Sequence, residues 1–418
     1  MIETEDRRQR LHSLIDLARV SRGWSRAQLA AALGRDPTKI YPDSGNPKAD
    51  FLVKLAEVLE WPVGDVIETI WGQSRDNPSR EGSSPEEERF EAIYTQARAA
   101  HLGGDYRRVV ALARRMYAVA ESEERRAFAC AFEYSGWDGL GRYLQGIEAA
   151  RRGLSHSPVS VTTRNILRAD LANAWYSVWD LTPALGTAEV LASWYETNPP
   201  EKTVDQKRPA FVYYVRGNTH RRLVYLEQEL REAHCRNARR DLTTSAQMYE
   251  RLSIELGDPS LAGIANTCRG GLIEIDVAMG DRKPEDAVDL MVNEVRSLES
   301  HPNRAIGDWR ESFGWWCIFA SNIALQHMTG RRLQEAMSYL LQQALEIADG
   351  LNNWAMRERV FTLQFTLHNR LTESSGLSLP LTIDDEDRSL ITATMGRFPA
   401  FRSVGWRILE TAKVVEAK

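Results

Sequence analysis

The chain has 418 residues, of which 43% are hydrophobic and 27% are charged, and its formal net charge at pH 7 is −5. This length suits two or three domains or one elongated array, and the composition excludes a disordered chain. The negative balance also excludes a general attraction to nucleic acid or to an anionic membrane, so either partner would require a local basic patch.

The cysteines and the apolar runs bear on cofactors and compartment. The four cysteines form no CxxC pair and no zinc-ligand spacing, so we expect reduced thiols, no metal site and no cofactor. The first residues are acidic, and the chain contains no run of about 18 apolar residues. We therefore expect a cytoplasmic protein without a membrane span. The cysteines are Cys130, Cys235, Cys268 and Cys317.

Motifs of several enzyme classes are missing, including the phosphate-binding loop, the dinucleotide-binding glycines, HExxH and GxSxG. Helical spacing of apolar residues dominates from end to end, and alternating β-branched runs are few. The sequence thus predicts an all-α protein that is not an enzyme. A cluster of buried titratable groups in a pocket would point back to catalysis.

Residues 7–71 predict a compact module of five short helices. Ser25 is the expected N-cap of the second helix, with Gln28 at the capping-box position. Asp36 is the expected N-cap of the third helix, which begins at Pro37. The apolar stripes are Leu11, Leu14, Ile15 and Ala18 in the first helix and Phe51, Leu52, Leu55, Ala56 and Leu59 in the fourth, and the fifth helix is expected from Val63 to Ile70.

The spacing of these residues resembles the repressor/Cro-type helix-turn-helix family, also called the XRE family. The resemblance rests on Trp24-Ser25-Arg26-Ala27-Gln28-Leu29-Ala30, Leu33-Gly34, Ile40, Leu52-x-x-Leu55-Ala56-x-x-Leu59 and Trp61 to Ile67. It implies that the third helix enters the DNA major groove and that the start of the second helix contacts phosphate. The residues implied in DNA binding are Arg26, Gln28, Arg35, Pro37, Thr38, Lys39 and Tyr41.

The third helix departs from the family pattern, because Pro42 disfavours a helical conformation at Tyr41. We expect the helix to end there after about one and a half turns and to present few base-reaching side chains. The charge distribution favours DNA contact: residues 7–48 contain nine Lys or Arg and three Asp, whereas residues 49–72 contain one Lys and five acids. The alternatives are an ordinary solvated face and a module retained for protein contact.

Residues 72–85 contain almost no apolar side chains and are predicted to be a linker, and residues 86–418 are predicted to form a helical repeat domain. The anchors Val109, Gly146 and Ala184 lie 37 and 38 residues apart. This pattern resembles the tetratricopeptide repeat, which implies stacked helical hairpins and a concave groove lined by the first helix of each pair. The alternative is an irregular helical domain. The recurring turns are Gly104-Asp105-Tyr106, Gly141-Arg142-Tyr143, Trp179-Asp180-Leu181, Gly280-Asp281 and Gly330-Arg331.

Polar residues predicted on or near the concave face are candidates to hold an extended peptide, because an asparagine side chain can pair with backbone amide groups. The layout is similar to that of bacterial regulators that join a helix-turn-helix module to tetratricopeptide repeats and sense peptides. The alternative is that these side chains satisfy helix ends or face solvent. The candidates are Asn173, Tyr176, Asn266 and Asn322.

These patterns together predict a transcription regulator that binds double-stranded DNA. We expect a homodimer, because one short helix reads few bases. The repeat domain is expected to mediate dimerisation and to accept a peptide or protein signal. The alternative is a protein–protein interaction scaffold with a degenerate helix-turn-helix module, which the early stop at Pro42 favours.

Overall fold

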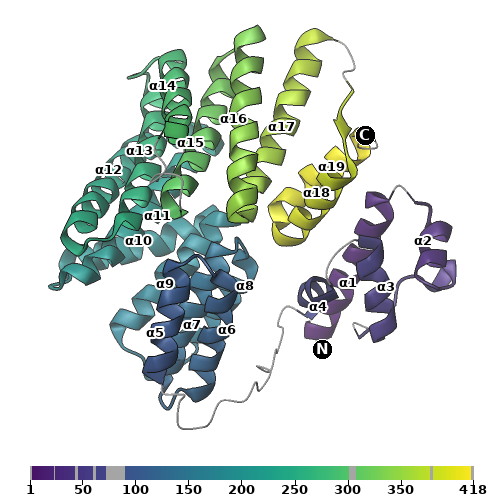
Figure 1. Ribbon diagram of the computed structural model, residues 1–418, viewed down its shortest axis with the longest axis horizontal. Coiled ribbons are helices and arrows are strands. Elements are labelled where there is room, and N and C mark those ends of the chain that lie inside the picture. Colours follow the sequence, from purple (N-terminus) through teal and green to yellow (C-terminus); the bar gives the residue numbers. More distant parts are fainter. Residues whose placement is uncertain are drawn as a thin grey trace. The chain divides into compact units, whose positions relative to one another are not determined.

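The computed structural model describes residues 2–22, 24–42, 46–59, 63–71, 90–300, 307–376 and 380–415. These residues are almost entirely helical, which confirms the predicted all-α class (Figure 1). The described strands are short: β1 (Thr382–Ile383) pairs in parallel with β2 (Lys413–Val414). The predicted linker at residues 72–85, and Gly23 and Trp61-Pro62 of the N-terminal pattern, lie outside the described residues.

Contacts between residues divide the chain into two compact units. The first contains residues 1–79 and 364–418, and the second contains residues 80–363. The boundary falls inside α17 (Trp354–Ser375). This division differs from the predicted one, which assigned residues 86–418 to a single domain.

The C-terminal helices belong to the first unit because α18 (Asp385–Arg397) and α19 (Arg402–Thr411) pack against α1 (Ile2–Ser21). A cavity of about 240 Å³ remains among these helices, beside Leu14 and Trp406. Packing between the two ends of a chain leaves no local periodicity, which is why the sequence patterns did not indicate it.

The N-terminal part of the first unit contains the helical segments in the predicted order. The predicted capping box is present: the Ser25 N–H donates to Gln28 Oε1 at 2.8 Å, and the Gln28 N–H donates to Ser25 Oγ at 3.3 Å. Leu11, Leu29 and Ile40 are fully buried and form part of its core. After α1, the segments are α2 (Arg26–Ala32), the 3-10 helix η1 (Pro37–Lys39), α3 (Ala49–Leu59) and α4 (Val63–Trp71).

The third helical segment is shorter than predicted. Asp36 caps it as expected, because its carboxylate accepts the Thr38 N–H at 2.8 Å, and Pro37 is its first residue. The segment is a three-residue 3-10 helix rather than one and a half turns of α-helix. Pro42 disfavours the helical conformation at Tyr41, so the chain leaves the helix as soon as Ile40 has entered the core.

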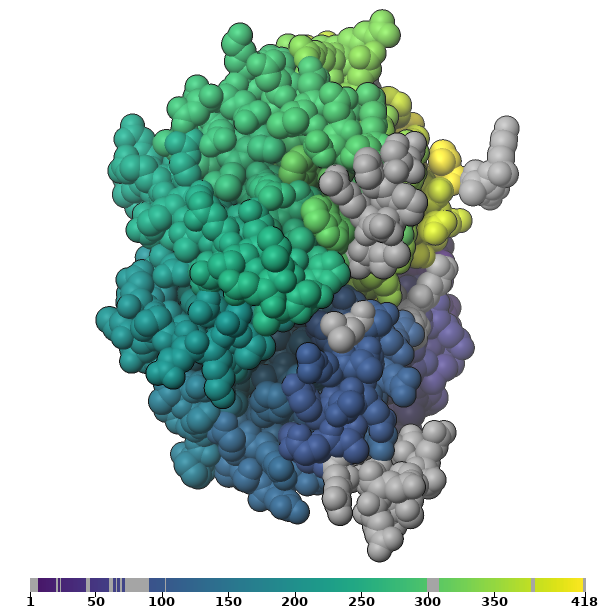
Figure 2. Space-filling model, turned by 60° about the vertical axis from the view of Figure 1, so that its left-hand side comes forward, coloured from purple at the N-terminus to yellow at the C-terminus, as the bar shows by residue number. Residues whose placement is uncertain are grey.

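The second unit consists of successive helices, and from α5 to α16 each helix packs against the next (Figure 1). In Figure 2, the colours from blue through teal to green follow one another across the surface, as sequential packing requires. Before α17, its described α-helices are α5 (Phe90–Leu102), α6 (Tyr106–Val119), α7 (Glu123–Gly139), α8 (Tyr143–Leu154), α9 (Val161–Ser177), α10 (Leu181–Thr197), α11 (Lys207–Leu226), α12 (Arg231–Leu256), α13 (Pro259–Met279), α14 (Pro284–Arg296), α15 (Gly307–His327) and α16 (Gly330–Leu351).

The predicted turns separate the helices of five pairs, and each begins with a residue of left-handed backbone conformation. The φ angles are 74° at Gly104, 62° at Gly141, 68° at Trp179, 81° at Gly280 and 61° at Gly330. The sixth pair, α11 and α12, is joined by the 3-10 helix η3 (Gln228–Leu230). Its second helix has 26 residues, which explains why the repeat pattern is lost in this part of the sequence.

The first helices of successive pairs form an inner layer. In this layer α7 contacts α9, α9 contacts α11, α11 contacts α13, and α13 contacts α15. Small residues bring some of these helices close: a Cβ atom at Gly263 of α13 would lie only 2.6 Å from the backbone of Asp308 in α15. The inner layer supplies most of the side chains of the cavity described below.

Candidate functional site

The structure presents two places where function can reside: a basic edge in the first unit and a polar cavity in the second. The basic edge is formed by Arg26, Thr38 and Lys39, all of which are exposed. Within the described part of the chain, neither Arg26 nor Lys39 forms an ion pair, so both cations are available to a polyanion. Thr38 Oγ1 donates to Asp36 at 2.5 Å, which fixes the side chain on the outer side of η1.

Tyr41 is held against the fold and does not belong to this edge. Its hydroxyl donates to the Asp16 carboxylate on α1, and the His12 ring packs edge-on against it at 5.2 Å. The Arg26 guanidinium lies 5.2 Å from the centre of the Tyr41 ring. Tyr41 was predicted to face a DNA groove, but the structure gives it an anchoring role, because its polar end points toward α1.

The remaining predicted DNA contacts differ in how free they are. The Arg35 guanidinium lies 4.4 Å from the centre of the Phe51 ring, and its Nη1 donates to the Lys39 carbonyl at 3.2 Å. Arg35 thus links η1 to Phe51 of α3. Gln28 is exposed but its amide oxygen is used in the capping box, and Pro37 is exposed at the start of η1.

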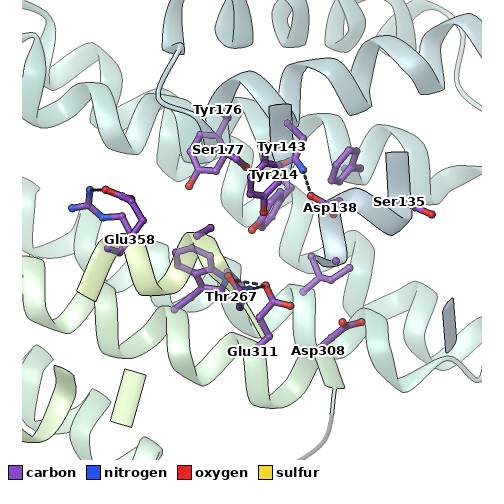
Figure 3. A pocket seen from close by; sticks show the side chains of 18 of the residues that line it. Ser135, Asp138, Tyr143, Tyr176, Ser177, Tyr214, Thr267, Asp308, Glu311 and Glu358 are labelled. Atoms are coloured by element: carbon purple, nitrogen blue, oxygen red, sulfur yellow. Dashed lines mark hydrogen bonds and ion pairs between the residues drawn. The ribbon is translucent and has the colours of Figure 1, made fainter. Parts of the chain in front are cut away.

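The cavity of the second unit has a volume of about 230 Å³ and is lined by residues of α5, α7, α9, α11, α13, α15 and the start of α17. These are the first helices of the successive pairs, the elements that the repeat resemblance implies for a concave face. Tyr106 and Tyr143, at the starts of α6 and α8, complete the wall. The close-up in Figure 3 shows the polar side chains that converge there.

One end of the cavity is acidic. Asp138 at the end of α7 faces Asp308 and Glu311 of α15 across the cavity (Figure 3). The Asn173 amide donates to Asp138 Oδ1 at 3.0 Å, and Glu311 Oε1 accepts from Trp315 Nε1 and Asn353 Nδ2, each at 3.1 Å. Among the described residues, none of these three carboxylates has a Lys or Arg partner.

Burial in this setting favours the neutral carboxylic acids. It raises the pKa of Asp138 to about 7, despite the hydrogen bond from Asn173. Burial, together with the nearby Glu311 carboxylate, raises the pKa of Asp308 to about 7. Burial also raises the pKa of Glu311. Near neutral pH, Asp138 and Asp308 are therefore partly protonated, and a cation bound beside them would favour release of these protons.

The opposite end of the cavity is basic. The Arg222 guanidinium lies 3.8 Å from the centre of the Tyr176 ring and 4.0 Å from that of Trp179, and it donates to the Tyr176 carbonyl. Burial lowers its pKa to about 10. The Arg359 guanidinium also lies over Trp179, 4.7 Å from the centre of the ring, and its Nη1 atom lies 3.6 Å from Glu358 Oε1.

The structure brings together two of the four predicted groove residues. Asn173 and Tyr176 line the cavity. Asn266 does not, because its amide donates to Ser312 Oγ at 2.8 Å between the closely packed α13 and α15. Asn322 donates to Glu274 at 3.1 Å, in a buried polar cluster outside the cavity lining.

The acidic residues of the cavity were not predicted. Asp138 follows Trp137, and Asp308 precedes Trp309, so each belongs to an aromatic segment that the sequence favours as packing. The turn at Gly141 could have indicated Asp138 as a candidate. A residue just before such a turn lies at the end of a first helix, and the first helices form the inner layer that lines the cavity. Asp138 has this position.

No family model matches the chain, and no curated protein sequence matches it. In the described ranges, no helix is both long and apolar enough to cross a membrane. Nor do the residues whose placement is described include a group of three His, Cys, Asp or Glu arranged to hold a metal ion. The function must therefore be argued from the two sites themselves.

Proposed function

We propose that the protein is a DNA-binding regulator whose first unit contacts duplex DNA through the basic edge. The observation that carries the proposal is that Arg26, Thr38 and Lys39 stay exposed and outside ion pairs with described residues, while Tyr41 and Arg35 beside them are fastened to the core. The segment from residue 7 to residue 48 has nine basic and three acidic residues, which supports contact with phosphate.

The contact is expected to rely more on phosphate than on bases. A three-residue 3-10 helix offers Thr38 and Lys39 to a groove, which is too little for specific recognition by one copy of the chain. Two copies that bind neighbouring half-sites would double the readout. A homodimer, with its contacts supplied by the helical second unit, is therefore part of the proposal.

The second unit is proposed to receive the signal. Its cavity is lined mainly by the inner layer, and buried polar groups converge in it with aromatic side chains, which is the usual makeup of a ligand site. Occupation of the cavity would favour one arrangement of helices over another and so bias DNA binding.

DNA binding by the full chain should be measured by fluorescence anisotropy with random-sequence and genomic duplexes between 50 and 200 mM salt. We expect affinity to fall steeply with salt, as counterion release requires. The double variant Arg26→Ala, Lys39→Ala should bind at least about tenfold more weakly at low salt and with a smaller salt slope. Arg331→Ala, on an exposed side chain of the second unit, is the matched control.

Two outcomes would contradict this proposal in different ways. Unchanged binding by the double variant would remove the basic edge from the interface. A wild-type chain that binds no duplex even at 50 mM salt, but co-purifies with a stoichiometric protein partner, would favour the interaction scaffold. The early end of η1 favours this second function.

Catalysis in the cavity is less well supported than binding. Buried titratable groups do gather there, as in many active sites. Ser135 Oγ, however, donates to the Phe132 carbonyl at 2.8 Å rather than to a base, and the His101 ring packs against Tyr106 at 5.6 Å. Among the described lining residues, no serine or threonine hydroxyl is hydrogen-bonded to a histidine, so an activated nucleophile is not formed.

A further inference from the structure

The cavity of the second unit has a chemical character that narrows the kind of ligand it can accept. Its lining carries the carboxylates Asp138, Asp308, Glu311 and Glu358 and the guanidinium groups of Arg222 and Arg359. Acids outnumber bases, and the imbalance is concentrated at one end, where Asp138, Asp308 and Glu311 face each other. A positively charged ligand would compensate this end, whereas an anion would be repelled.

The walls beside the acidic end are aromatic. Tyr143, Tyr214, Phe211 and Trp315 line the cavity, and the Phe211 and Tyr214 rings are stacked with centres 6.2 Å apart. Aromatic faces attract ammonium groups and also cover apolar bodies. A carboxylate cluster bordered by such faces suits an organic cation, in which a charged nitrogen is attached to an apolar body.

A metal ion does not fit this arrangement. Among the described residues, no three His, Cys, Asp or Glu side chains are arranged to ligate a metal ion, and an ammonium nitrogen, which sits farther from its oxygen partners than a bound metal does, has less strict demands. Each of the three acidic-end carboxylates is also already hydrogen-bonded by polar side chains: Asp138 by Asn173 and Tyr134, Asp308 by Ser260, and Glu311 by Trp315 and Asn353. All three residues line the cavity, and a carboxylate has about four acceptor sites, so each can accept a further hydrogen bond from the N–H groups of a protonated amine.

The basic end of the cavity limits how far positive charge can extend along a bound ligand. Arg222 is buried, is sandwiched by Tyr176 and Trp179, and has no carboxylate partner within salt-bridge distance in the described structure. Arg359 lies beside it. A linear polyamine that filled the whole cavity would place a second positive charge against these groups. A compact ligand with its charge at one end avoids that repulsion.

We propose that the cavity of the second unit binds a compact organic cation, an amine or quaternary ammonium with an aromatic or alicyclic body. Asp138, Asp308 and Glu311 hold the charged nitrogen, and Tyr143, Tyr214 and Trp315 cover the body. The signalling consequence rests on the regulator proposed above, but the binding does not depend on DNA and can be tested alone.

The test is isothermal titration calorimetry of the full chain at pH 8 with phenethylamine, tyramine, cyclohexylamine and benzyltrimethylammonium. We expect at least one of them to bind at one site per chain, at least tenfold more tightly than its uncharged or anionic counterpart. For phenethylamine these counterparts are 2-phenylethanol and phenylacetate. Spermidine tests the length limit and is expected to bind more weakly than the best compact amine. This comparison uses the wild-type chain, so it does not depend on a variant that folds.

Variants then locate the site. Glu311→Gln and Asp138→Asn are nearly isosteric and should each weaken amine binding at least tenfold, while Glu232→Gln, on an exposed helix surface, should leave it unchanged. Failure of every cation in the panel to bind would overturn the proposal, as would a neutral analogue that binds as tightly. A wild-type chain that binds an amine but no duplex DNA would contradict only the proposed regulatory function and would leave the cavity proposal intact.

Discussion

At Gly141 the backbone has a φ of +62°, and a Cβ atom would lie 3.0 Å from the Trp354 nitrogen. This residue has two reasons to be glycine. The left-handed conformation ends α7 and turns the chain into α8, and the missing side chain lets the start of α17 approach. That approach brings Asn353 and Glu358 to the cavity whose other wall holds Asp138.

Substitution of this single glycine should therefore cost stability. We expect Gly141→Ala to lower the free energy of unfolding by about 1–3 kcal/mol, because alanine meets both the strained φ and the Trp354 backbone. Urea denaturation followed by circular dichroism would measure it. Gly186 of α10 has no neighbour within 4 Å, so Gly186→Ala should be neutral or stabilising by up to about 1 kcal/mol. Equal effects of the two substitutions would contradict the account.

Tyr41 provides a second test at the scale of one residue. Its hydroxyl is spent on Asp16, so Tyr41→Phe should lower the free energy of unfolding by about 1 kcal/mol. The same variant should bind duplex DNA within twofold of wild type, because the hydroxyl faces α1. If Tyr41→Phe instead lowers DNA affinity tenfold without changing stability, Tyr41 contacts DNA after all.

At the scale of helices, the turns could be predicted and the packing could not. Gly104, Gly141 and Trp179 begin turns where the sequence placed them, because a left-handed residue beside an N-cap is a local signal. Asn266 lies outside the cavity lining because Gly263, one turn earlier, lets α15 approach closely and Asn266 donates to Ser312 of that helix. Close approach of two helices far apart in the sequence has no local signature.

The cavity was missed for the same physical reason. Asp138 and Asp308 belong to α7 and α15, and no spacing along the chain relates them. Asn173 and Tyr176, which were predicted to share one face, line the cavity together because both lie on α9, about one helix period apart. Sequence patterns therefore reached one helix of the site, and the rest required the stacking of several pairs.

Between α11 and α13 lies a buried ion pair whose loss should be costly. Arg221 Nη1 donates to Glu274 Oε2 at 2.5 Å, and these side chains are 5% and 0% exposed. Glu274→Leu leaves a buried guanidinium without its counterion and should lower the free energy of unfolding by about 3–5 kcal/mol. The exposed Arg331–Glu335 pair is the control, since Glu335→Leu should cost less than about 1 kcal/mol. Similar losses in both variants, measured by urea denaturation, would contradict the assignment.

At the scale of the whole chain, the buried acids link pH to ligand binding. A bound cation favours the ionised carboxylates, so binding releases protons from groups whose pKa is about 7, as at Asp138 and Asp308. Phenethylamine affinity should rise at least about tenfold from pH 6 to pH 8. The other titratable or charged groups around these acids are His101, Tyr106, Tyr134, Tyr143, Asp170, Tyr214, Arg222, Asp258, Glu311, Glu358 and Arg359.

The predicted pH dependence of amine affinity requires a control that distinguishes the two acids from other titrating groups. Burial lowers the pKa of His101, which moves its titration away from pH 7 and toward the acidic side, in contrast to Asp138 and Asp308. Calorimetry in buffers of different ionisation enthalpy should show proton release near pH 7. An affinity that is flat between pH 6 and pH 8 would contradict the participation of Asp138 and Asp308.

A site that keeps acids buried should reduce the stability of the empty protein. Asp138 has a folded-state pKa of about 7, above its ordinary value of 3.8. Between these two pH values the folded chain keeps a proton that the unfolded chain has lost, so the free energy of unfolding falls as pH rises from about 4 to about 7. Asp138→Asn removes this cost, and we expect it to raise the free energy of unfolding by about 1–3 kcal/mol at pH 8 and by less at pH 5. The variant should at the same time bind amines at least tenfold more weakly, because an amide cannot supply the negative charge that pairs with the ammonium group. Urea denaturation at both pH values, beside calorimetry with phenethylamine, would check both effects. A variant that is destabilised at pH 8 would show instead that the carboxylate serves the fold, through its hydrogen bond with Asn173, rather than a ligand.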